Sequence, residues 1–113
     1  MTRHELNPII GGYQMVTVTG TAQSLLQLAG LPRFPKATNG ALIQIDHVND
    51  LENNDLAIRY REDGTAPNST TGIVMELGGL REFVDIEQLT NVKFISADPG
   101  NAVRMSIQFY KGN

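Results

Sequence analysis

The sequence predicts an all-β fold: a single antiparallel β-sandwich or jelly-roll-like domain of about seven or eight short strands. Short segments of alternating or β-branched apolar residues recur along the chain, and turns rich in Gly, Pro, Asn and Asp separate them. No segment has the sustained period of a long helix. With 113 residues, the chain is long enough for one hydrophobic core and too short for two.

The first half of the chain contains two clear strand patterns. Residues 1–12 have no sustained period and end in a Gly pair, so we expect an N-terminal arm, or a frayed end, before a sandwich domain of residues 13–113. Residues 13–19 are rich in β-branched side chains, and residues 41–48 alternate with Ala41, Ile43 and Ile45 on one face; both patterns predict strands. Residues 21–31 fit either a short strand or one helical turn.

The centre of the chain predicts a strand, a polar loop and a second strand. Ile58 and Tyr60 alternate with Arg59 and Arg61, which is the period of a strand with one apolar and one polar face. Residues 62–72 contain no large apolar side chain and predict a connecting loop. Further strands are expected at residues 73–77, 82–86, 92–97 and 102–110.

The last expected strand has a clear inward and outward face. The inward side chains are Val103, Met105, Ile107 and Phe109, and the outward ones are Arg104, Ser106, Gln108 and Tyr110. A strong turn signal, Asp98-Pro99-Gly100-Asn101, precedes this strand.

Composition argues against several classes of function. The net charge is -3, and the basic residues form no cluster beyond Arg59 and Arg61, so we expect no nucleic-acid partner. Without cysteine there is neither a disulfide nor a thiolate metal site. The N-terminal segment lacks the apolar region of a secretory signal, and no apolar run is long enough to span a membrane. We therefore expect synthesis in the host cytoplasm and no membrane association.

One segment resembles a known group of proteins. In Arg59-Tyr60-Arg61-Glu62-Asp63-Gly64-Thr65-Ala66-Pro67, followed by Thr71-Gly72, a strand of alternating arginine runs into an acidic turn with Gly, Thr and Pro. This segment resembles small β-sandwich auxiliary structural proteins of tailed bacteriophages, which decorate or stabilise the head. Residues 92–97 and 102–110 resemble the closing pair of strands of that family. The similarity covers roughly residues 41–110.

The resemblance implies a virion structural protein. We expect a decoration or cement protein on the outer surface of the capsid, with the major capsid protein or other virion proteins as partners. Because such proteins sit where several capsid subunits meet, a homo-oligomer is expected, and a trimer is plausible. A tail, neck or fibre adaptor is the alternative, and a carbohydrate-binding module is a more distant one. No cofactor and no catalytic residue is implied.

Candidate partner contacts lie on the central loop, its stem and the last strand. They are Arg59, Arg61, Asp63, Thr65, Pro67 and Tyr110. The competing interpretation is an ordered hairpin connection, in which Asp63 and Thr65 bond to local backbone and Gly64 forms the turn. The two arginines are equally consistent with ion pairs, a subunit contact or a solvated sheet face.

Other polar groups make weaker candidate sites. Asp46 and His47 are adjacent, so a strand directs them to opposite faces and they cannot form a catalytic pair. The spacing of Asp50, Glu52 and Asn54 faintly resembles a calcium loop, but it lacks the sixth-position Gly and the closing Glu. We expect a solvated acidic turn there, no metal site, and no enzymatic activity.

Overall fold

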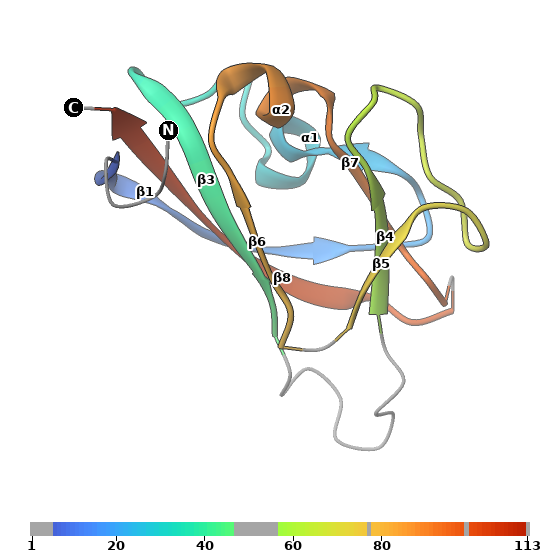
Figure 1. Ribbon diagram of the computed structural model, residues 1–113. Coiled ribbons are helices and arrows are strands. Elements are labelled where there is room, and N and C mark those ends of the chain that lie inside the picture. Colours follow the sequence, from blue (N-terminus) through green and yellow to red (C-terminus); the bar gives the residue numbers. More distant parts are fainter. Residues whose placement is uncertain (1–5, 47–56, 77, 99, 113) are drawn as a thin grey trace.

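The computed structural model describes residues 6–46, 57–76, 78–98 and 100–112 (Figure 1). Within these described residues, eight strands and two short helices follow one another. The elements are β1 (Leu6–Val18), β2 (Gln23–Ser24), α1 (Leu25–Ala29), β3 (Thr38–Ile45), β4 (Ala57–Arg61), β5 (Ile73–Glu76), β6 (Leu80–Phe83), α2 (Ile86–Asn91), β7 (Lys93–Ser96) and β8 (Val103–Gly112).

The strands form two antiparallel four-stranded sheets that pack together as two layers (Figure 1). Sheet A has the order β1-β8-β3-β6, and sheet B has the order β2-β7-β4-β5. Strand β4 pairs with β5, β3 with β6, β2 with β7 and β1 with β8, as in one long hairpin wound around itself. This winding is that of a jelly roll. The predicted all-β sandwich is therefore confirmed.

The hydrophobic core lies between the two sheets and is built from alternate residues of the strands. Ala41, Ile43 and Ile45 of β3 are buried, as the alternation predicts. Aromatic rings link the layers and loops: Phe34 meets Phe109 edge to face at 5.9 Å between ring centroids. The largest fully buried side chains are Phe83, Phe94, Phe109, Leu25, Ile43, Ile45, Ile58, Leu89, Met105, Ile107 and Val18. Each such side chain contributes about 1.5–3 kcal/mol relative to exposure.

Strand β1 begins earlier than the sequence pattern indicates. It starts at Leu6, which lies inside the segment predicted as an arm, and residues 1–5 are outside the described part of the chain. The pairing with β8 moves from Pro8 opposite Tyr110 to Tyr13 opposite Gln108, so residues 9–12 form a bulge. The bulge interrupts the two-residue period, which hides the first part of the strand in the sequence.

The ambiguous segment of residues 21–31 contains both of the predicted alternatives. Strand β2 occupies only Gln23–Ser24, and α1 follows at once. A capping box starts the helix, since Gln27 N–H donates to Ser24 Oγ at 3.2 Å and Ser24 N–H donates to Gln27 Oε1 at 2.9 Å. Gly30 ends it in the left-handed conformation, with φ at 68°.

A second helix replaces part of a predicted strand. The strand expected at residues 82–86 is β6, Leu80–Phe83, and α2 starts three residues after it. Asp85 caps α2 by accepting from Gln88 N–H at 2.8 Å, and the Gln88 side chain accepts from Val84 N–H at 2.9 Å. The pattern Asp-x-x-Gln is a helix start signal that could have been read from the sequence.

The turn predicted between the last two strands is present. Asn101 N–H donates to the Asp98 carbonyl at 2.9 Å, and Gly100 N–H donates to Asp98 Oδ1 at 3.2 Å. The buried Ser96 hydroxyl donates to the Asp98 carbonyl at 2.8 Å, which fastens the turn to β7. Pro99 lies outside the described residues.

Candidate functional site

The candidate site is the connection between β4 and β5, together with its stem. Arg59 lies on the outer face of sheet B and points its guanidinium at this connection. Its Nε donates to the Ser69 carbonyl at 3.1 Å, and its Nη1 donates to the Gly72 carbonyl at 3.0 Å. A charged side chain thus holds the far end of the loop against the strand from which the loop departs.

Close packing fixes the same end of the loop. Gly72 has φ at +135°, which an L side chain rarely adopts. A Cβ on Gly72 would lie 3.1 Å from Pro67 Cβ and 3.2 Å from Arg59 Cβ. Pro67 itself is buried. The predicted loop is therefore an ordered connection folded back on its own stem.

The tip of the loop is an aspartate-centred turn. Thr65 N–H donates to Asp63 Oδ1 at 3.2 Å, and Gly64 between them has φ at +84°. These local bonds are those that the ordered-hairpin interpretation predicts. Residues 63–66 are all exposed, so the turn displays its side chains to solvent.

Arg61 and Asp63 form an exposed ion pair beside the turn. Arg61 Nε donates to Asp63 Oδ1 at 3.2 Å, and Arg61 Nη2 bonds to Asp63 Oδ2. The hydrogen bond from Arg61, helped by the Thr65 amide, lowers the pKa of Asp63 below its ordinary value, and the same hydrogen bond raises the pKa of Arg61. Arg61 therefore pairs with a carboxylate two residues along the chain, and not with an acidic residue on a neighbouring strand.

A second ion pair joins this region to sheet A. Arg81 of β6 donates from Nη2 to both Glu62 oxygens, at 2.8 and 2.9 Å. Partial burial opposes the charge on Arg81, but the hydrogen bond and Coulomb attraction of Glu62 and the nearby Tyr60 raise its pKa overall. The guanidinium also lies 4.9 Å from the centroid of the Phe83 ring. The sequence offered no signal for this pair, because its partners are distant along the chain.

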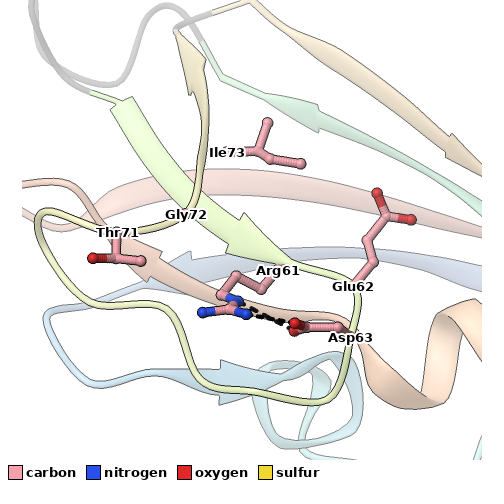
Figure 2. A pocket seen from close by; sticks show the side chains of 6 residues that line it. All are labelled: Arg61, Glu62, Asp63, Thr71, Gly72 and Ile73. Atoms are coloured by element: carbon pink, nitrogen blue, oxygen red, sulfur yellow. Dashed lines mark hydrogen bonds and ion pairs between the residues drawn. The ribbon is translucent and has the colours of Figure 1, made fainter.

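A shallow hollow of about 470 Å³ lies beside the loop (Figure 2), and it is lined by Arg61, Glu62, Asp63, Thr71, Gly72 and Ile73. Arg61 and Asp63 face each other along one wall, Glu62 points away from them, and Thr71 and Ile73 stand on the β5 side. The three charged groups of the hollow are each engaged in one of the two ion pairs above. The hollow therefore suits contact with another surface better than binding of a highly charged small molecule.

The structure gathers five of the six predicted contact residues in this region. Arg59, Arg61, Asp63, Thr65 and Pro67 belong to the loop or its stem, and the first four take part in the hydrogen bonds described above.

Tyr110 lies elsewhere, in β8, next to the core residue Phe109, and it is buried although the strand period places it on the outward face. It is 8% exposed. It stands opposite Pro8 of β1 and Gly40 of β3, beside the bulge of residues 9–12. Simple alternation does not anticipate that bulge. Tyr110 therefore offers a partner little surface.

The remaining polar candidates form no site in the described part of the chain. Asp46 lies 3.7 Å from Arg104, between Oδ2 and Nη1. His4, His47 and the acidic turn of residues 50–55 are outside the described residues. Among residues 6–46, 57–76, 78–98 and 100–112, no three His, Cys, Asp or Glu side chains are placed to share a metal ion. Neither described helix is long and apolar enough to cross a membrane.

Comparisons of the chain with protein-family models, with curated proteins and with solved structures find no match. The resemblance to phage head proteins therefore stays a prediction.

Proposed function

We propose that this protein is a structural component of a tailed-phage virion, and specifically a decoration or cement protein that binds the outer surface of the head shell. One observation carries the proposal: the β4–β5 loop displays an exposed turn, residues 63–66, on a braced stem. A preorganised loop loses less conformational entropy when it docks than a flexible one does. The jelly roll is also an architecture that capsid proteins use, although fold alone does not decide function.

The loop suits recognition of a protein surface. Its end is fixed by Arg59 and by the close packing of Gly72 with Pro67, while its tip offers a turn of mixed polarity. Docking onto a repeated shell lets a modest contact recur many times. Each contact can approach a standard interface of about 800 Å² per partner.

The alternative of a carbohydrate-binding module fits less well. Such sites present aromatic rings to the sugar, and two of the three tyrosines, Tyr60 and Tyr110, are buried. Tyr13 is the exposed one, and it lies on β1, away from the loop.

Binding to purified phage heads that lack the protein tests the proposal. We expect the full chain to saturate the outer surface of the head in electron microscopy. Ala66→Glu, at the exposed tip, should weaken binding at least about tenfold, since it places an unmatched charge in the contact. Gly100→Glu is the matched control, because it adds the same charge to an exposed turn elsewhere.

Density on the tail or neck would favour the adaptor alternative instead. Equal binding by the two glutamate variants would remove the loop from the contact. Failure of the full chain to bind any part of the particle would contradict the proposed function itself.

A further inference from the structure

In the described part of the chain the two open sheets have four edge strands, and three of them are protected against pairing with another chain. Edge strands present unpaired backbone groups, which proteins shield by short length, charges, proline or bulges. Strand β2 has only two residues. Strands β5 and β6 have four residues each, and they carry Glu76 on β5 and Arg81 and Glu82 on β6.

Strand β1 is the exception among the edges. It is 13 residues long, and the chain has no charged residue anywhere in residues 6–32. Pro8 and the bulge protect only its first part. Residues 13–18 then run in unbroken register with β8.

The side chains along this second part of β1 are exposed and uncharged. Tyr13 is 55% exposed, Met15 is 41% exposed, and Thr17 is also exposed. Ile10, on the adjacent bulge, is 101% exposed. A long, uncharged and partly apolar edge of this kind is a template for strand pairing.

We propose that residues 13–18 of β1 pair antiparallel with the same residues of a second copy of this chain. Sheet A of each copy would then continue into sheet A of the other across a two-fold axis. A second copy is the occupant that the edge fits, because two-fold pairing places each residue beside one from the same segment. Like charges in such a segment would repel each other across the axis, and this segment has none.

The size and symmetry of the contact determine the affinity of the dimer and its number of copies. Six paired residues span roughly 20 Å, and the area that they bury is below the roughly 800 Å² per partner of a standard interface. The dimer is therefore weak and depends on concentration. Each copy has a single β1 edge, so the pairing closes at two copies. It does not produce the trimer expected from the resemblance to head decoration proteins. This inference is independent of the proposed function.

Sedimentation of the purified full chain over a concentration series tests the proposal. We expect a monomer–dimer equilibrium in the roughly micromolar to millimolar range. The double variant Met15→Lys and Thr17→Lys should raise the dissociation constant at least about tenfold, because it brings like charges together at the edge. Val74→Lys is the control: Val74 is 47% exposed on the edge strand β5, and its replacement should leave the constant unchanged.

Hydrogen exchange locates the contact and confirms that the variants fold. Amides of residues 13–18 should exchange more slowly at high than at low concentration, whereas those of residues 73–76 should not change. Core amides of both variants should keep their protection. A chain that is monomeric throughout, a trimer, or a dimer that survives the two lysines would each overturn the proposal.

Discussion

The outer side of sheet B around the β4–β5 loop and the β1 edge of sheet A are built in opposite ways. In the first region, charged side chains are engaged within the molecule: Arg59 holds two loop carbonyls, and Arg61 pairs with Asp63. Along the β1 edge, residues 13–18 carry no charge, and two large apolar side chains, Tyr13 and Met15, face solvent. The loop region is ordered by bonds within the molecule, whereas the β1 edge is open to pairing with another strand.

The contrast extends to how sheet B covers its own apolar residues. Ile95 of β7 lies opposite Arg59 in the sheet register, on the outer face, and yet it is 7% exposed. Met15 also faces outward, but it lies on the edge strand β1 of sheet A and remains open to solvent. Ile95 lies on β7, an inner strand with β2 and β4 on either side, so position within the sheet separates the two residues.

Gly72→Ala should cause the largest loss of stability, because Gly72 is closely packed against Pro67 and Arg59. The substitution forces a side chain into a backbone with φ at +135° and against Pro67 and Arg59. We expect a loss of about 3 kcal/mol in the free energy of unfolding, measured by urea denaturation. Gly100→Ala is the control, since its Cβ would meet only Asp98 Oδ1, at 3.7 Å. A neutral Gly72→Ala would mean that the loop rearranges freely.

Arg59→Met should have the next largest effect. It keeps much of the side-chain bulk but removes the bonds to the Ser69 and Gly72 carbonyls. We expect about 2 kcal/mol of destabilisation, together with faster proteolysis within residues 62–72. Arg61→Met, which removes only the exposed pair with Asp63, should change stability much less. If both variants lost the same stability, Arg59 would contribute no more to the fold than the exposed Arg61 does.

Acidification should loosen the tip of the loop and leave the β1 edge unaffected. The folded state lowers the pKa of Asp63 below its ordinary value of 3.8, so its ionised form stabilises the fold above that value. The contribution disappears as the pH falls through the lowered pKa, because protonation breaks the bond to Arg61. Asp63→Asn should remove this part of the acid dependence, as followed by chemical-shift titration of Thr65 N–H. An unchanged titration in the variant would assign the dependence to another carboxyl group.

Thr17→Lys should have the smallest effect on the isolated monomer. Thr17 is exposed on an edge strand, so we expect the free energy of unfolding to change by less than about 0.5 kcal/mol at a concentration where the chain is monomeric. A larger loss, measured by the same urea denaturation, would show that the β1 edge already has a structural role within one copy.

Local pattern was sufficient where strands alternate without interruption. The buried positions of β3 and the inward set of β8 follow from the two-residue period, and the loop after Arg61 follows from its lack of large apolar residues. The period fails at residues 9–12, where the bulge hides the first part of β1, and it does not predict that Tyr110 on the outward face of β8 is buried. It also fails at α2, where Phe83-Val84-Asp85-Ile86 has the composition of a strand although Asp85 and Gln88 cap a helix.

The local bonds of Asp63 and Thr65 could be predicted from the sequence, but the bonds of Arg59 and Glu62 could not. The segment from Arg59 to Pro67 contains its own stem and turn, so sequence proximity was enough to group these residues. The partners of Arg59 are backbone carbonyls, and the partner of Glu62 is Arg81 on the other sheet. Such contacts depend on how the two sheets pack in the folded chain, which no local sequence pattern predicts.

The pairing of β1 with β8 has a practical consequence, because it sets Leu6 opposite Gly112. The two ends of the folded body emerge at one corner of the sandwich, as Figure 1 shows. A short flexible linker could therefore connect them, and new ends could be opened at an exposed turn without reordering the sheets. That corner lies well away from the β4–β5 loop (Figure 1).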